Sequence, residues 1–241
     1  MSLVVTVFVP EGIVIAGDSR LSLTYPTKDE ATQKEFLHTI TASDSNDKVF
    51  LVKDKFGLGT FGVADIKGMP IAGFINRFVE EKVTDATEVD QIPQLLLDFF
   101  GQPYNFPAVS FYVAGYKIEN AVSNQHVHFL NVASKQMNQV NTTANPSGAN
   151  WGGEIEVMSR LLSPVKLKQG DQWNELHAAP LPFNFFTLQD AIDFSVYAVR
   201  TTIESFRFQQ RPKTVGGAID ILLLKPGEKP FWVAKKKYKA D

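Results

Sequence analysis

Hydrophobic and β-branched residues gather in short runs near the start of the chain. The runs Leu3–Val9 and Gly12–Ala16 are separated by a Pro-Glu turn, a pattern typical of a β-hairpin. Runs at 48–52 and 56–61 predict a second hairpin. The residues from 21 to 47 are mostly polar and mixed around a short strand-like piece, 36–40, and they predict a surface loop insertion rather than a domain.

Further along the chain, the spacing of apolar residues changes from the pattern typical of strands to the one typical of helices. Apolar residues at i, i+3, i+4, i+7 and i+8 from Ile71 predict an amphipathic helix. A longer helix is predicted to begin near Thr187, which forms a capping box with Asp190. The remaining predicted elements are a helix at 89–100, strands at 108–114 and 126–131, a Gly/Asn/Ser-rich stretch at 145–153, a short helix at 154–162, and strands at 218–224 and 230–235.

This order of elements is neither a β-α-β alternation nor a helical bundle, because strands and helices are segregated along the chain. It predicts an α+β fold. Two stacked antiparallel sheets with helices on both outer faces, a four-layer αββα sandwich, would bury every apolar stripe. No linker-like segment divides the 241 residues, so a single domain over 1–241 is expected.

Composition narrows the possible functions. With 44% apolar residues the chain can bury a large core, and a disordered chain is excluded. The net charge of -2 gives no sign of a nucleic-acid partner or an anionic membrane partner, and Lys235–Lys237 is expected to be a solvated tail. The chain has no cysteine, so any nucleophile is an oxygen. Because the first residues contain no signal-peptide or membrane-span pattern, a cytoplasmic location is expected.

One segment carries a family resemblance. Gly12-Ile13-Val14-Ile15-Ala16-Gly17-Asp18-Ser19-Arg20 resembles the second strand of proteasome β-subunits, which are N-terminal-nucleophile (Ntn) hydrolases. If the two sequences are aligned at Asp18 and compared toward the N-terminus without a gap, Ser2 matches the family's nucleophile. Ser2 becomes the first residue when Met1 is removed. The family uses threonine at this position, and serine supplies the same Oγ and the same free α-amine.

The chemistry explains why the N-terminus matters. A hydroxyl is a weak nucleophile until a base takes its proton, and an α-amine with a pKa near 8 is a suitable base. While Met1 is attached, that amine is an amide nitrogen and cannot act as a base. Removal of Met1 is therefore expected to activate the site.

The resemblance implies roles for other residues. Lys48 matches the lysine that lowers the pKa of the nucleophile, and Asp18 would keep this lysine charged and oriented. Gly62, in the turn after the second hairpin, would donate its N–H to the oxyanion. Phe61 would line the pocket for the substrate residue before the cleaved bond. Ser147, in Asn145–Ala149, would bond the α-amine, although a turn serine is an equally good interpretation.

Near the C-terminus, Thr214–Asp220 resembles the family's Gly-Gly turn and returning strand. Typical members have an Asp-x-x-Ser before this Gly-Gly, whereas this chain has Pro212 and Val215. The resemblance is continuous over the first third of the chain and returns at this strand pair.

The resemblance implies a peptidase that acts on peptides or unfolded proteins and assembles as a homo-oligomeric ring. A small-molecule amidase with the same fold stays open, as does an inactive scaffold or peptide-binding subunit. His126 and His128 are the only pair with metal-like spacing, and without a third ligand they predict no metal site. No nucleotide-binding motif is present, and no cofactor is expected.

Overall fold

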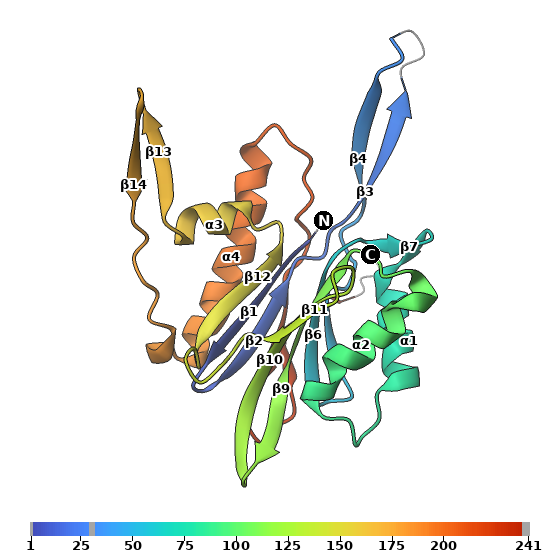
Figure 1. Ribbon diagram of the computed structural model, residues 1–241, viewed down its shortest axis with the longest axis vertical. Helices are drawn as coiled ribbons and strands as arrows, with labels where there is room; N and C mark the ends of the chain where they lie inside the picture. The colour runs from blue at the N-terminus through green and yellow to red at the C-terminus, as the bar shows by residue number, and fades with distance from the viewer. Residues whose placement is uncertain (1, 29–31, 238–241) are drawn as a thin grey trace.

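The computed structural model describes residues 2–28 and 32–237 and contains two five-stranded antiparallel sheets (Figure 1). The predicted α+β class is confirmed. Met1, whose removal the sequence analysis expects, lies outside the described residues.

The first sheet is built around the N-terminal hairpin. Its strand order is β12 (Gly148–Gly153), β1 (Leu3–Val9), β2 (Gly12–Gly17), β15 (Asp220–Leu224) and β16 (Phe231–Ala234). The hairpin register pairs Val4 with Gly17, and β15 pairs Asp220 with the same Gly17. Strands from both ends of the chain therefore meet where β1 begins.

The second sheet contains the second predicted hairpin. Its strand order is β11 (Gln136–Gln139), β10 (Val122–Asn131), β9 (Val109–Glu119), β6 (Phe56–Gly62) and β5 (Val49–Val52). Three two-stranded sheets complete the strands: β3 (Leu21–Lys28) with β4 (Glu35–Ser43), β7 (Asp65–Ile66) with β8 (Met69–Pro70), and β13 (Val165–Gln169) with β14 (Gln172–Leu176).

The helices follow the predicted apolar stripes. They are α1 (Ile71–Lys82), α2 (Ile92–Phe100), α3 (Glu156–Leu162) and α4 (Leu188–Phe208), with 3-10 turns at Val89–Gln91, Gln102–Tyr104 and Phe183–Phe185. The capping box at α4 is present, because the Thr187 side chain accepts a hydrogen bond from the Asp190 amide and the Asp190 carboxylate accepts one from Thr187 N. This reciprocal bonding satisfies amides that a helix start otherwise leaves unpaired.

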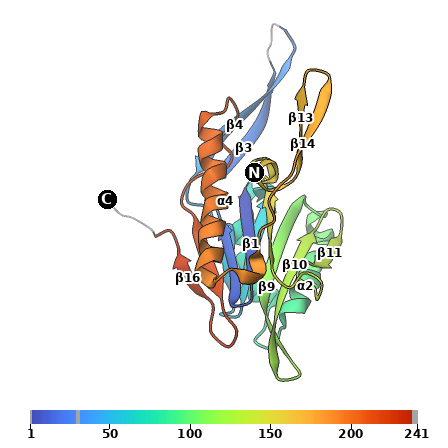
Figure 2. The same ribbon diagram turned by 90° about the vertical axis from the view of Figure 1, so that its left-hand side faces the viewer.

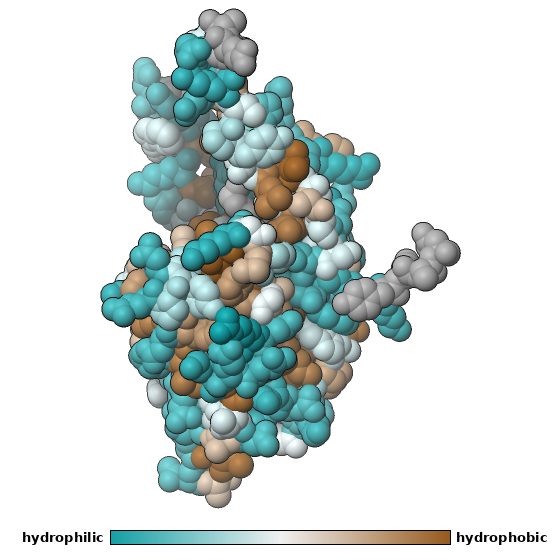
Figure 3. Space-filling model, turned by 90° about the vertical axis from the view of Figure 1, so that its right-hand side faces the viewer, coloured by the Kyte–Doolittle hydropathy of each residue, from teal (hydrophilic) through white to brown (hydrophobic). Residues whose placement is uncertain are grey.

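Three apolar clusters fix how the layers pack. Residues of α4 pack with alternate residues of β1, β2 and β15 (Figure 2). Residues of α1 and α2 pack with β6, β9 and β10, and charged and polar side chains cover most of the solvent face on that side (Figure 3). The third cluster joins the two sheets, with Val4 and Ile15 on one side and Tyr112 and Val127 on the other.

Two segments predicted as loops are strands. The segment between Arg20 and Asp47 forms the β3–β4 hairpin, which projects from the end of the molecule where β1 begins (Figures 1 and 2). The strand-like piece predicted at 36–40 lies in β4, whereas the rest of the segment was predicted as a loop because it is polar and mostly exposed, as expected of a two-stranded arm with no layer covering it. The Gly/Asn/Ser-rich stretch includes β12, an edge strand of the first sheet. No helix among residues 2–28 and 32–237 is both long and apolar enough to cross a lipid bilayer.

Candidate active site

The peptide group that joins Ser2 to Leu3 is held by hydrogen bonds at both its carbonyl oxygen and its amide. Its carbonyl oxygen accepts a bond of 2.8 Å from the amide of Glu154. The amide of the next residue, Leu3, donates to Asp18 Oδ1 at 2.9 Å, and Asp18 N donates to Leu3 O at 3.2 Å. Ser2 itself is 8% exposed. The start of β1 is therefore a fixed point of the structure.

The predicted pair of Asp18 and Lys48 is present and buried. Lys48 Nζ lies 2.9 Å from Asp18 Oδ1, with the two side chains 4% and 0% exposed. The ammonium also donates to the carbonyl oxygen of Arg20 at 2.5 Å. Asp18 Oδ2 accepts from the amides of Arg20 at 3.1 Å and Gly216 at 3.0 Å. Since a buried charge requires compensating partners, these bonds are what allow the pair to exist in the core.

The environment of Lys48 changes its acidity. Burial lowers the pKa of the Lys48 ammonium below its usual value, and the charge and hydrogen bond of Asp18 oppose this shift. The desolvation of the cation is the larger of the two effects. A lysine in this position favours negative charge on a neighbouring oxygen, which is what an attacking hydroxyl develops.

Ser2 and Lys48 line one small hollow. The other lining residues come from three places: the base of the β3–β4 arm, the end of β6, and the start of α1. They are Arg20, Leu21, Asn46, Asp47, Thr60, Phe61, Val63, Ala64 and Ile71. The structure thus brings the candidate nucleophile, its candidate lysine and the predicted glycine turn to the same location.

Gly62 is required by the backbone at the end of β6. Its φ of +109° lies in a region that side chains other than glycine rarely adopt, and a Cβ there would stand 2.3 Å from the carbonyl oxygen of Ala108. Its neighbours Phe61 and Val63 both line the hollow beside Ser2. Gly62 therefore lies at the rim of the site, and its role as oxyanion donor stays a prediction.

Gly62→Ala is expected to destabilise the protein by about 1–3 kcal/mol, because alanine would be strained at this φ and would collide with Ala108. The matched control is Gly73→Ala in α1, where an added Cβ meets no atom within 4 Å. This control is expected to be neutral or to stabilise by up to about 1 kcal/mol through helix propensity. Urea unfolding of both variants measures the difference, and equal effects would contradict the backbone argument.

Phe61 is fixed between the two sheets. Its ring packs at 5.3 Å from that of Tyr112 and at 6.4 Å from that of Phe129. One side of the residue lines the hollow that contains Ser2. A role in selecting the substrate side chain stays a prediction, and the ring's position between aromatic partners leaves it little freedom to move.

The structure does not bring Ser147 to Ser2, so this part of the prediction is wrong. Ser147 directly precedes β12, whose first residue Gly148 pairs with Phe8 at the far end of β1. The Ser2 end of β1 pairs instead with Gly153. Five residues of strand separate the two ends of β12, a distance of about 17 Å. The error came from treating a strand as a loop.

The residues that do reach Ser2 from β12 were missed by the sequence analysis. They are Gly153 and Glu154, at the junction of β12 and α3. The Glu154 carboxylate accepts from Thr214 Oγ1 at 2.6 Å and from Arg211 Nη2 at 3.1 Å. The sequence feature that could have indicated them is Gly152-Gly153-Glu154, which lies between β12 and α3. Functional side chains are often found at such a junction of a strand and a helix.

The Gly216-Gly217 segment adjoins Asp18, in keeping with its place in the predicted motif. Ser19 N donates to Gly216 O at 2.9 Å, besides the bond from Gly216 N to Asp18. Val215, which stands where typical family members have serine, is buried in the apolar cluster against α4. No polar group of residue 215 is therefore available to Ser2.

His126 and His128 lie on one face of β10, with ring centroids 5.8 Å apart. Among the described residues no group of three or more His, Asp or Glu side chains is arranged to hold a metal ion. Burial lowers the pKa of His128 to about 4, helped by the nearby His126 and opposed by Asp90. His128 is therefore expected to make the stability of the protein depend on pH.

The unfolded chain binds a proton at His128 near pH 6.5, whereas the folded protein does so only near pH 4. The free energy of unfolding is therefore expected to fall as the pH is lowered from 6.5 to 4, and His128→Gln should remove this component. His177→Gln, at a side chain that is 83% exposed, is the control. Urea unfolding across this pH range tests the expectation, and an unchanged slope in His128→Gln would contradict it.

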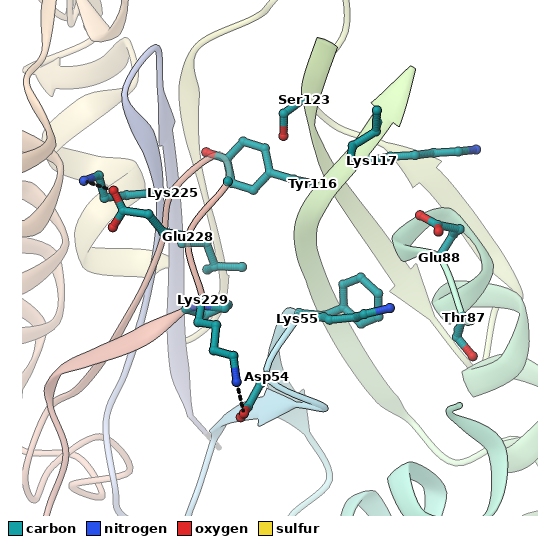
Figure 4. A pocket seen from close by; sticks show the side chains of 15 residues that line it. Asp54, Lys55, Thr87, Glu88, Tyr116, Lys117, Ser123, Lys225, Glu228 and Lys229 are labelled. Carbon is teal, nitrogen blue, oxygen red and sulfur yellow. Dashed lines mark hydrogen bonds and ion pairs between the residues drawn. The ribbon is translucent and has the colours of Figure 1, made fainter. Parts of the chain in front are cut away.

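A wide cleft lies at the opposite end of the sheets, where Phe56, Tyr116 and Leu224 form its apolar wall (Figure 4). Three of its four lysines have acidic partners: Lys225 pairs with Glu228 at 2.6 Å, Lys229 with Asp54 at 3.4 Å and Lys117 with Asp90 at 2.5 Å. The fourth, Lys55, donates to the backbone carbonyl oxygen of Asp85. Because most of these charges are paired, the cleft does not identify a ligand. It is also remote from Ser2, since Leu224 pairs with Ile13 at the turn end of β2.

Neither a scan of protein-family models nor a search of curated proteins finds a match for this chain. The assignment of function therefore depends on the geometry around Ser2.

Proposed function

We propose that this protein is an Ntn hydrolase similar to proteasome β-subunits, with Ser2 as its nucleophile after removal of Met1. The observation that carries the proposal is the buried Asp18–Lys48 pair, whose lysine lines the same hollow as Ser2. A buried ion pair is costly, and sequences without a use for one can replace it with apolar residues at no loss of stability. Its position beside an N-terminal hydroxyl supports a catalytic role.

The arrangement of layers supports the same class. We propose the layer order α3 and α4, first sheet, second sheet, α1 and α2, which is the four-layer αββα sandwich of Ntn hydrolases, and the three apolar clusters support it. In this proposal the nucleophile directly precedes the inner strand β1 of one sheet, and the lysine directly precedes the edge strand β5 of the other.

The proposed reaction is hydrolysis of a peptide or amide bond in two steps. In the first, the α-amine accepts the proton of Ser2 Oγ, Oγ bonds to the substrate carbonyl carbon, and the proton passes to the leaving amine as the C–N bond breaks. In the second, water attacks the resulting ester with the same amine as base, releasing the acid and restoring Ser2. Lys48 stabilises the developing negative charge, and Gly62 N–H is the proposed donor to the oxyanion.

An inactive scaffold or peptide-binding subunit is the second candidate. It is favoured by the buried, apolar Val215 and by Pro212, which replace the polar residues of typical family members. The retained Asp18–Lys48 pair argues against it. A small-molecule amidase would share the mechanism and differ in substrate alone.

The proposed substrates are peptides or unfolded proteins, and the proposed assembly is a homo-oligomeric ring that encloses the sites. The function is tested by incubating the full chain with N-acylated peptides, simple amides and an unfolded protein, and measuring newly formed amines. The hydrolase is supported by amine release, and the pattern of substrates separates peptidase from amidase. Saturable peptide binding without amine release would identify the scaffold.

A further inference from the structure

We infer that Glu154 is a positioning residue for Ser2, acting through backbone and side-chain hydrogen bonds that hold the peptide group joining Ser2 to Leu3. This inference rests on the proposed function, since it assumes that Ser2 is the first residue of the mature chain. Glu154 belongs to the junction of β12 and α3 and has no counterpart among the residues that the family resemblance identifies.

The first connection is through the backbone. Gly153 has a φ of +99°, and a Cβ on this residue would lie 1.8 Å from the carbonyl oxygen of Ser2. Only glycine permits this approach, which lets Glu154 N donate to Ser2 O at 2.8 Å. The position of the Ser2 carbonyl is thereby tied to the position of Glu154.

The second connection is through the Glu154 side chain. Glu154 is 7% exposed, so its carboxylate needs polar partners. Thr214 Oγ1 donates to one oxygen at 2.6 Å, and Arg211 Nη2 donates to the other at 3.1 Å. Arg211 is itself oriented by stacking on the ring of Phe206, 3.9 Å from its centroid. The carboxylate is thus bonded to the segment 211–214 and cannot rotate freely.

These bonds form a closed circuit that begins and ends at the peptide group between Ser2 and Leu3. Two residues after Thr214, Gly216 N donates to Asp18 Oδ2 at 3.0 Å, and Asp18 Oδ1 accepts from Leu3 N at 2.9 Å. The path runs from the Ser2 carbonyl through Glu154, Thr214 and Asp18 to the amide of the residue after Ser2. Asp18 is also the partner of Lys48. The circuit therefore couples the main chain of Ser2 to the position of the ammonium.

This coupling matters for a residue that supplies both nucleophile and base. The Oγ and the α-amine of Ser2 depend on one backbone orientation, and a small misplacement of reacting groups lowers the rate strongly. Loosening the Glu154 side chain should reduce turnover without changing substrate affinity, because the substrate does not contact this carboxylate.

The test compares Glu154→Gln with the matched control Glu156→Gln. Glu156 pairs with the same Arg211, at 2.7 Å through Nη1, but has no bond to Thr214 in the structure and lies outside the circuit. Thr214→Val, which removes one donor to the Glu154 carboxylate, is a second variant with a smaller structural change. All are measured on the full chain with Ser2 as its first residue, after thermal unfolding has shown each to be folded.

Two readouts are used. Peptide hydrolysis gives kcat and KM, and we expect kcat to fall about tenfold in Glu154→Gln with KM unchanged, as for a lost alignment of reacting groups. The second readout needs no hydrolysis. Periodate cleaves an N-terminal serine that has a free amine and hydroxyl, and we expect Ser2 to be oxidised several-fold faster in Glu154→Gln and in Thr214→Val because the residue is less constrained.

Wild-type values for Glu156→Gln together with changed values for Glu154→Gln and Thr214→Val support the inference. An oxidation rate of Ser2 that is the same in Glu154→Gln and wild type would overturn it. If the wild type hydrolyses nothing while oxidation still accelerates in Glu154→Gln, the positioning role stands and the hydrolase function fails. If the wild type is active and both readouts are unchanged in Glu154→Gln, the positioning role fails and the hydrolase function stands.

Discussion

Ser2→Ala is expected to reduce hydrolysis by about a thousandfold or more, since removing a nucleophile eliminates the covalent path and leaves only binding and oxyanion contributions. The variant keeps the hydrogen bond from Glu154 N to the carbonyl oxygen of residue 2 and the bond from Leu3 N to Asp18 Oδ1. It should therefore fold like the wild type. Initial rates of peptide hydrolysis, with thermal unfolding as the check on folding, measure the effect.

Ser2→Thr is the matched control for this loss. Threonine presents the same hydroxyl and α-amine, so this variant should retain activity within about tenfold. Activity in Ser2→Ala close to that of the wild type would show that another residue or a contaminant performs the reaction. Equal loss in Ser2→Ala and Ser2→Thr would point instead to a structural role of the small serine side chain.

Asp18→Ala is expected to destabilise the protein by about 3–5 kcal/mol and to abolish activity, because it leaves the buried Lys48 ammonium without its carboxylate. It also removes the acceptor for the amides of Leu3, Arg20 and Gly216, which come from three separate segments. Urea unfolding monitored by fluorescence gives the change in free energy.

Asp44→Ala is the control for Asp18→Ala. Asp44 also forms an ion pair, with Arg20 at 2.6 Å, but its side chain is 47% exposed. A solvent-exposed pair contributes about 0–1 kcal/mol, so this variant should be nearly as stable as the wild type. Similar destabilisation by the two substitutions would contradict the account of Asp18 as the buried junction of the site.

Secondary-structure elements with a regular spacing of apolar residues, or with a capping motif, could be predicted from the sequence. The stripe from Ile71 to Val79 is helix α1, and the Thr187–Asp190 capping box begins α4 as expected. These elements depend on local order in the sequence, which fixes the face or the end of an element. The pair of Asp18 and Lys48 was predicted from the family resemblance, and the structure brings the two residues into contact.

Long-range pairing was the part that could not be predicted. Ser147 lies in a Gly/Asn/Ser-rich stretch whose composition indicates a loop, yet tertiary contacts make residues 148–153 an edge strand beside β1. Strand propensity depends on such contacts more than helix propensity does. As a result, the residue brought to Ser2 is Glu154, and the sequence alone gave no register that would have identified it.

The prediction for the basic run near the C-terminus was also wrong. The run Lys235–Lys237 was expected to be a solvated tail, but Lys235 and Lys236 bond the carboxylate of Asp220, which is 1% exposed. Both also pair with Asp47, the neighbour of Lys48. Asp220 lies 15 residues before Lys235, whereas Asp47 is 188 residues away from it, and composition reveals neither partner.

The central claim is that Ser2, freed of Met1, is a working nucleophile. The most direct test is the intact mass of the purified protein before and after incubation with a β-lactone or epoxyketone probe that reacts with N-terminal hydroxyl nucleophiles. The account predicts loss of Met1 and the addition of one probe molecule on Ser2, absent in Ser2→Ala. Retention of Met1, or a processed chain that gains no probe, would contradict it and favour the scaffold.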